Sequence, residues 1–490
     1  MTWPVGSSFV LVAASVLAAA AAPAFEGLFP AGAPRGETLT VIALGIPGTN
    51  AFRLWSDDPN LVFNAGKTNG QFQVAISTNA TVGPHWVRAF DDHEVSSPHL
   101  FIVGETPELV FLQPPPAAGT TSVVEQLPAT LNVLLRHPEE TNAFTLRLAH
   151  DQFLEARFQA FALDSPVEAT LALVNAAGLQ LTATDPSTNA DPVLTCLIAA
   201  DGLYRLRVTA RCPADDTGTN VVAGAFYRLV LAAGTPPPAP ATNSDAMEDK
   251  IVRPALSEPW LVFPATVHGI LNPPGNEDIY SFNARAGDSF TFSVQAASLG
   301  SPLSALLLVR DADRREVARA DAAPDPVLNW AAPADGRYAV IVTDAQRRGG
   351  MGYGYIIDFL PPQGEFSATV PAHTFKVAAG GQVRVPVQVA RSAQCQGILS
   401  VVLGVLPEGV STAPLHSTPE LKGLAFTVAA SPAAKPGGGP FRIVLFTTDQ
   451  TPPLSATATA PVKGKHTPAG GLLLNTIDQF WLNVERKPNP

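Results

Sequence analysis

The segment HEVSSPH at residues 93–99 combines residue types that could bind a catalytic zinc ion. Zinc peptidases carry two histidines about four residues apart on one helix face, with a glutamate between them. Here His93 and His99 stand six positions apart, and Pro98 would break a helix between them. The segment therefore predicts a surface turn that leads into a strand, and not a zinc site.

Other residue types that could do nucleophilic or acid–base chemistry are isolated in the sequence. No G-x-S-x-G segment is present, which excludes a nucleophile elbow. His150 and Asp151 are adjacent, but no third group in the sequence orients them as in a catalytic triad. No glycine-rich turn joins a strand to a helix as in a phosphate-binding loop. These residues predict no recognisable catalytic site.

The sequence contains a long internal repeat. The phrase LDSPVEATLALVN at 163–175 returns as LGSPLSALLLVRD at 299–311. The match extends over 118–236 and 254–361. Its further anchors are Pro128-Ala129-Thr130 with Pro264-Ala265-Thr266, Asp191-Pro192 with Asp325-Pro326, Tyr204 with Tyr338, and Tyr227 with Tyr355. Such a long period indicates tandem copies of one unit, and a unit of about 110 residues can hold its own core. The phrase itself predicts a turn that feeds a core strand.

Both copies show the period-two alternation of half-buried strands. FTFSVQA at 290–296 puts phenylalanine, valine and alanine on one face and polar residues on the other, and LEARFQA at 154–160 does the same. Asp201-Gly202 and Asp335-Gly336 are expected to turn β-hairpins. Short strands at regular spacing predict an antiparallel β-sandwich for each copy.

The order of these anchors resembles the bacterial pre-peptidase C-terminal domain. The second copy carries the pattern at Asp278, Tyr280, Phe282, Gly287, Asp288, Ser301, Pro302, Asp311, Asp325, Asp335, Gly336 and Tyr338. The first copy departs from it, with Asn142 in place of Asp278 and Asn175 in place of Asp311. The resemblance implies a jelly-roll-like sandwich of the type appended to secreted proteases and envelope proteins, with a targeting or adhesion role. Tandem copies with Ig-like flanks look like exported proteins of planctomycete-type bacteria.

The same resemblance implies candidate calcium ligands, because relatives that bind calcium use acidic residues near the entry linker and the first strand. The candidates here are Asp245, Glu248, Glu277 and Asp278. Calcium takes about six to eight oxygen ligands, which such a cluster could supply. The family's Glu-Pro-Asn linker signature is missing, so solvated linker charge is the alternative. The first copy is not expected to bind calcium, and no other cofactor is expected.

Proline-rich runs at 113–121, 234–249 and 361–366 divide the chain. The predicted organisation is all-β, with four tandem antiparallel β-sandwiches after a signal segment. The expected units are a signal peptide at 1–24, an Ig-like sandwich at 25–113, the two repeat copies at 118–236 and 245–361, and an Ig-like or NEW3-like sandwich at 362–490.

Composition agrees with an exported β protein. The 490 residues include 47 prolines and 38 glycines, and only 15% are charged. The net charge of −11 argues against nucleic acid as a partner. The first residues form an apolar run that ends in Ala22-Pro23-Ala24, as in a secretory signal, although no lysine or arginine precedes it. We expect export to the periplasm, the outer surface or the medium, with no membrane span in the mature chain.

Cysteine and aromatic residues give weaker signals. Cys196, Cys212 and Cys395 are interpreted as free thiols, with a Cys196–Cys212 bridge through a neighbouring loop as the alternative. Trp55, Trp86, Trp260 and Trp330 are too scattered to predict a carbohydrate platform. Trp330 and the matched Tyr227 and Tyr355 are expected in the cores.

Function is predicted from this organisation. The first hypothesis is an exported, non-catalytic binding or adhesion protein that acts at the cell envelope or on an extracellular protein or polysaccharide. One alternative is an accessory or targeting subunit of a secreted peptidase. Another is an exported hydrolase whose site converges between sandwiches and is invisible in the sequence.

Overall fold

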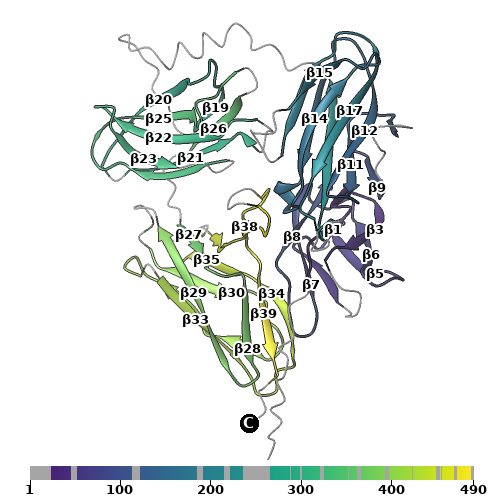
Figure 1. Ribbon diagram of the computed structural model, residues 1–490. Coiled ribbons are helices and arrows are strands. Elements are labelled where there is room, and N and C mark those ends of the chain that lie inside the picture. The colour runs from purple at the N-terminus through teal and green to yellow at the C-terminus, as the bar shows by residue number, and fades with distance from the viewer. Residues whose placement is uncertain are drawn as a thin grey trace, which may run out of the picture.

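The computed structural model confirms the all-β class (Figure 1). It describes residues 24–486, apart from 46–51, 113–121, 185–190, 215–220, 235–264, 287, 298–300, 321–324, 351–352, 361–365, 392–394, 396, 422, 449–452, 454 and 468–471. Within that part, the regular structure is strands and one short 3-10 turn, η1 (Phe161–Leu163). No helix there is long and apolar enough to cross a membrane. The expected signal segment lies almost wholly outside the described residues.

The first sandwich consists of a sheet in the order β1-β3-β6-β5 and a sheet in the order β2-β8-β7-β4. Its strands are β1 (Leu28–Phe29), β2 (Gly32–Pro34), β3 (Thr38–Ala43), β4 (Arg53–Ser56), β5 (Leu61–Ala65), β6 (Gln71–Ile76), β7 (Gly83–Phe90) and β8 (His99–Gly104). Alternation explains these strands, since Phe72, Val74 and Ile76 of β6 are buried while Gln73 between them is exposed.

The first repeat copy has five strands in each sheet, in the orders β10-β12-β17-β14-β15 and β16-β13-β18-β11-β9. Its strands are β9 (Glu108–Phe111), β10 (Ser122–Val124), β11 (Ala129–Leu134), β12 (Glu139–Leu148), β13 (Phe153–Gln159), β14 (Glu168–Val174), β15 (Gln180–Ala183), β16 (Val193–Leu197), β17 (Gly202–Arg211) and β18 (Phe226–Gly234). Phe144, Phe158 and Tyr227 are among its fully buried side chains.

The second repeat copy has four strands in each sheet, in the orders β19-β26-β21-β24 and β20-β25-β22-β23. Its strands are β19 (Ala265–Ile270), β20 (Glu277–Ala284), β21 (Ser289–Gln295), β22 (Ala305–Asp311), β23 (Glu316–Ala320), β24 (Val327–Ala331), β25 (Gly336–Asp344) and β26 (Gly354–Leu360). Its buried cluster comes entirely from this copy and holds Phe282, Phe292, Trp330 and Tyr355. Trp330, Tyr355 and Tyr227 are thus core residues, as predicted.

The final sandwich contains three larger sheets, in the orders β27-β29-β33-β31, β28-β39-β34 and β32-β30-β35-β36, and the pair β37-β38. Its strands are β27 (Phe366–Thr369), β28 (Thr374–Ala378), β29 (Gln382–Arg391), β30 (Leu399–Leu403), β31 (Val410–Thr412), β32 (Leu415–Ser417), β33 (Gly423–Ala430), β34 (Gly437–Phe441), β35 (Ile443–Thr447), β36 (Ser455–Thr457), β37 (Ala460–Pro461), β38 (Thr476–Ile477) and β39 (Phe480–Glu485). In β29 the side chains alternate as expected for a strand with one buried face. Val385, Val387 and Val389 point inward between exposed residues.

The expected hairpins at the Asp-Gly turns are wrong. β16 lies in the sheet of β13 and β18, whereas β17, which follows the Asp201-Gly202 turn, lies in the opposite sheet between β12 and β14. The second copy repeats this arrangement with β24 and β25. The turn therefore crosses between the two layers instead of joining paired strands. An Asp-Gly pair indicates a tight turn but does not choose the partner strand.

The link between the first sandwich and the first repeat is a paired strand. β9 lies before the expected boundary at residue 113, yet it pairs in parallel with β11 of the first repeat. Only residues 105–107 separate it from β8 of the first sandwich. β10 likewise pairs in parallel with β12. The first repeat thus carries an added parallel strand at one edge of each sheet.

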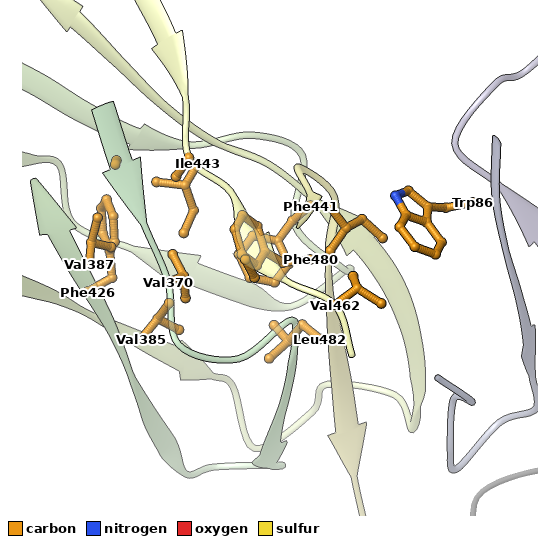
Figure 2. Close-up of a cluster of buried hydrophobic side chains, with 14 of the residues drawn as sticks. Trp86, Val370, Val385, Val387, Phe426, Phe441, Ile443, Val462, Phe480 and Leu482 are labelled. Atoms are coloured by element: carbon orange, nitrogen blue, oxygen red, sulfur yellow. The ribbon is translucent and has the colours of Figure 1, made fainter. Parts of the chain in front are cut away.

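The final sandwich folds back onto the first two and shares a buried cluster with them. That cluster combines its own core with Phe29, Trp86 and Leu100 of the first sandwich and with Leu163 and Phe226 of the first repeat. Figure 2 shows Trp86 approaching Phe480 and Val462 from a strand of the first sandwich. These three sandwiches therefore form one packed body.

Candidate functional site

Of the four predicted calcium ligands, the structure describes Glu277 and Asp278. Asp245 and Glu248 lie outside the described residues. Glu277 and Asp278 are successive residues of β20, so their side chains face opposite sides of the sheet. Glu277 is half-exposed and binds both terminal nitrogens of Arg310, at 2.7 and 3.0 Å. This guanidinium lowers the pKa of the Glu277 carboxyl.

Asp278 belongs to a buried hydrogen-bond network instead. The hydroxyl of Tyr355 donates to its Oδ2 at 2.5 Å, and Asn276 Nδ2 donates to its Oδ1 at 2.9 Å. The hydroxyls of Tyr280 and Tyr355 lie 2.6 Å apart. Burial, with the nearby Tyr280 and Asp278, raises the pKa of Tyr355 well above its usual value. Within the described residues, no group of three or more histidine, cysteine or acidic side chains is placed to hold a metal ion.

The structure places His93, His99 and His150, which the sequence analysis considered for chemistry, in three separate environments. His99 begins β8 and is buried, with its ring 5.2 Å from that of Phe25 in an edge-to-face contact. Burial lowers the pKa of His99. His93 lies in the exposed turn that the sequence predicted. His150 Nδ1 and Asp151 Oδ2 are 3.1 Å apart, but both side chains are largely exposed.

All three cysteines are free, as interpreted from the sequence. Cys395 is buried in the final sandwich, and Cys196 and Cys212 are half-buried in the first repeat. Burial, with the nearby Glu140, raises the pKa of the Cys212 thiol to about 11. A thiol with a raised pKa is a poor nucleophile near neutral pH.

A junction that the sequence did not reveal joins the three packed sandwiches through Asp164. Its carboxylate accepts backbone N–H groups of the final sandwich from Lys465 at 2.8 Å, His466 at 2.8 Å and Thr467 at 3.2 Å. The side chain of Lys465 also binds Glu26 of the first sandwich. Asp164 aligns with Gly300 of the second copy. This difference between the copies is the sequence feature that could have pointed to the junction.

A second contact fixes β9 on the first repeat. The Glu108 carboxylate binds Arg228 of β18, and both side chains are 3% exposed. Asn132 of β11 donates to the same carboxylate at 2.6 Å. A buried ion pair of this kind holds only when the remaining polar atoms are also bonded. No sequence feature indicated this pair, because its members are far apart in the chain.

The seam between the first and final sandwiches holds a buried cation. Arg88 of β7 is fully buried, and its Nη2 lies 3.2 Å from His373 Nδ1 of the final sandwich. Burial lowers the pKa of Arg88 to about 9. Burial and the neighbouring Arg88 lower the pKa of His373 to about 4, so its imidazole is neutral at pH 7. Trp86 Nε1 donates to Thr476 O across the same seam at 3.0 Å.

The outer end of this seam gathers aromatic rings that looked scattered in the sequence. Trp481 of β39 meets Trp55 of β4 edge-on at 5.8 Å and Phe90 of β7 at 5.0 Å. Arg53, whose side chain is 63% exposed, lies over the Phe90 ring at 4.6 Å. Trp55 and Phe90 are half-buried, and Trp481 is buried. We call Arg53, Trp55, Phe90 and Trp481 the seam cluster. Trp260 lies outside the described residues.

The seam cluster combines packed aromatic rings with one exposed guanidinium. Half-buried aromatic rings offer rigid apolar surface at a small entropic cost, and an exposed guanidinium adds directional hydrogen bonds. Arg53 and Trp55 lie on β4, the outer strand of its sheet, and the Arg53 side chain is exposed.

Comparisons with known proteins assign this chain to no family. No family model and no curated protein match it. Among solved structures, the pre-peptidase C-terminal domain of a collagenase from Bacillus anthracis is 18% identical and covers 20% of this chain and 88% of its own, with a TM-score of 0.17.

Two longer matches are equally weak. SGBP-B from a mixed-linkage glucan utilization locus of Bacteroides ovatus, solved in complex with a mixed-linkage heptasaccharide, is 10% identical over 68% of this chain and 72% of its own, with a TM-score of 0.15. An α-2-macroglobulin of Escherichia coli is 10% identical over 93% of this chain and 52% of its own, with a TM-score of 0.16. At these scores the superpositions carry no weight for function.

Proposed function

We propose that this chain is an exported, non-catalytic binding protein that holds an extracellular polymer against the seam cluster. The observation that supports this is the exposed Arg53 guanidinium over the half-buried Phe90 ring, beside the half-buried Trp55. Tryptophan and arginine are the residues most often found at binding hot spots. A rigid body keeps them in place without an ordering cost when the polymer binds.

The use of the polar groups supports binding over catalysis. Asp164 holds three backbone N–H groups, and Glu108 is paired with Arg228. Each of these groups stabilises a contact between sandwiches. Export rests on the apolar N-terminal run and its small-residue end, which lie in the sequence alone.

The test is binding of the full chain to the host's own envelope and to a panel of polysaccharides and collagen. Arg53→Ala is expected to weaken binding about tenfold, because it removes an exposed guanidinium without removing a ring of the seam. Asp92→Ala is the matched control, since Asp92 only pairs with Arg53 at the surface. Equal loss in both variants, or no loss in either, would contradict the seam cluster as the site.

The same samples decide the alternatives. Running each with calcium and with chelator shows whether Asp245, Glu248, Glu277 and Asp278 contribute a metal site. Casein or ester turnover that one substitution abolishes would replace the binding proposal with an exported hydrolase. Co-purification of a secreted peptidase from the host would make the chain its accessory subunit.

A further inference from the structure

His85 is a buried titratable side chain at the end of the core of the first sandwich. It belongs to β7, whose Trp86 and Arg88 reach across the seam to the final sandwich. Val87 and Ala89 of the same strand belong to the core of the first sandwich. Because side chains alternate along a strand, His85 lies on the inward face with Val87 and Ala89. It therefore lies directly behind the residues that form the seam.

Both ring nitrogens of His85 lie within hydrogen-bond distance of an acceptor. Nδ1 is 3.1 Å from Oδ1 of the Asp57 carboxylate, and Nε2 is 2.7 Å from the backbone carbonyl oxygen of Thr81. A neutral imidazole carries one N–H, so it would donate to one acceptor and turn a lone pair toward the other. The imidazolium donates to both. These two contacts therefore favour the charged form of His85.

The charged groups that act on this ring are two carboxylates of the loop between β4 and β5. Asp57 contacts the ring directly, and Asp58 adds a second negative charge nearby. On the other sides, β8 places Phe101 opposite His85, and the final sandwich reaches this corner through the uncharged Gln479. Burial lowers the pKa of His85, but the hydrogen bonds of both ring nitrogens and the charges of Asp57 and Asp58 together raise it above its usual value.

The contacts of His85 tie two loops of the first sandwich to each other and to the seam. The ring joins Asp57, which follows β4, to Thr81, which precedes β7. Asp57 Oδ2 also accepts the backbone N–H of Trp86 at 3.1 Å, and Asp57 O accepts from Nε2 of Gln479 in the final sandwich at 3.2 Å. An uncharged His85 would release either Asp57 or Thr81, and so loosen the corner that the final sandwich contacts.

We propose that His85 is a charged clamp behind the seam: its imidazolium holds Asp57 and Thr81 together, and loss of its proton to water in alkaline solution loosens this corner and weakens docking of the final sandwich. A histidine whose charged form is favoured by folding contributes its full stability below its ordinary pKa of about 6.5, and loses it as pH rises through the higher folded value. His373 sets the opposite limit, because its neutral form is the one that docks beside Arg88. The seam is therefore tightest in a pH window between the two histidines, and this property does not depend on polymer binding.

The protonation state is measured by nuclear magnetic resonance on the full chain with nitrogen-labelled histidine. The His85 signals are those missing from the variant His85→Gln. They are expected to show two protonated ring nitrogens that titrate with a midpoint above pH of about 6.5. Asp57→Asn keeps an acceptor but removes the charge, so the midpoint should fall by about 1 in pH or more. A midpoint at or below the ordinary value, or one that does not respond to Asp57→Asn, would overturn the proposal.

Hydrogen exchange measures the consequence for the corner and for the seam. After correction for the intrinsic rate, protection at 81–86 and at 476–479 should fall by up to about tenfold per pH unit above the midpoint. The series stops at a pH of about 8, because Arg88, whose pKa is about 9, would lose its proton beyond it. Protection at 81–86 that stays constant over this range would contradict the clamp. Loss at 81–86 without loss at 476–479 would contradict its effect on docking.

Variants separate His85 from other titrating groups. His85→Gln should exchange rapidly at 81–86 already at neutral pH and lose the pH dependence there. His150→Gln removes an exposed histidine of the first repeat and is the matched control, which should behave as the unchanged chain does. If His85→Gln fails to fold, Asp57→Asn should move the onset of exchange to lower pH. Arg53→Ala should leave the exchange unchanged, which separates this result from polymer binding at the seam cluster.

Discussion

The two repeat copies share one sandwich plan but have different roles in the molecule. The first copy is held by two contacts, one to β9 through Glu108 and Arg228 and one to the final sandwich through Asp164. The second copy has Ile356 and Gly300 at the positions of Arg228 and Asp164. The positions of Arg228 and Asp164 thus distinguish a copy that contacts its neighbours through buried or charged groups from a copy whose described core is its own.

The same contrast appears inside the two cores. In the first copy, the Tyr227 hydroxyl donates to Asn142 Oδ1 at 2.9 Å. In the second copy, the matched Tyr355 donates to a carboxylate, Asp278, and a further tyrosine joins the pair. A neutral amide needs one donor here, whereas a buried carboxylate needs several. The second core is thus the more polar of the two.

Removing the buried ion pair between β9 and β18 should have the largest effect. Glu108→Ala leaves the buried Arg228 without its carboxylate, which we expect to destabilise the first repeat by about 3–5 kcal/mol. Denaturant unfolding of the full chain measures this change. The double variant Glu108→Leu/Arg228→Met should recover most of the loss, because an apolar pair needs no desolvated charge. A double variant as unstable as the single one would contradict the ion-pair explanation.

Acid should open the seam between the first and final sandwiches while the second repeat stays folded. The pKa of His373 falls to about 4 on docking. The undocked imidazole, with a pKa near 6.5, binds a proton that the docked one refuses, so docking weakens as pH falls from about 6.5 to 4. The loss reaches up to about 3 kcal/mol at pH 4. Tryptophan fluorescence follows it, and His373→Asn should flatten the pH dependence. A seam equally pH-sensitive in that variant would assign the effect to other groups.

Asp164→Gly gives the first copy the residue of the second. Asp164 has a φ of 63°, a conformation that glycine adopts freely, so the variant removes the carboxylate without adding backbone strain. We expect docking of the final sandwich to weaken by about 1–3 kcal/mol. Faster hydrogen exchange at residues 465–467 reports this loss. Unchanged exchange there would show that the shared apolar cluster alone holds the junction.

Matched tyrosine variants compare the two cores most finely. Tyr227→Phe should cost about 1 kcal/mol, the usual value of one buried neutral hydrogen bond. Tyr355→Phe should cost roughly 1 kcal/mol more, because it deprives a buried carboxylate of a donor. Thermal unfolding of each variant gives the difference. Equal costs would mean that Asp278 keeps enough donors without Tyr355.

The sequence by itself determined the fold class, the repeat and much of the core. Period-two alternation marks strands because successive side chains point to opposite faces. Tyr227 and Tyr355 were predicted to be buried because they match between the copies, and Trp330 because it follows a predicted strand. The sequence also assigned the free thiols. These features depend on near neighbours in the chain, which a sequence displays directly.

Only the tertiary structure decided how strands and sandwiches are joined. The Asp201-Gly202 turn crosses between sheets because pairing depends on the partners each strand meets, and not on the turn. Asp164, Glu108 and Trp481 became junction residues because distant segments met there. Glu277 and Asp278, adjacent in the sequence, were separated by the pleat of β20. Local spacing fixes which face a side chain takes, but burial against a remote partner decides what it binds.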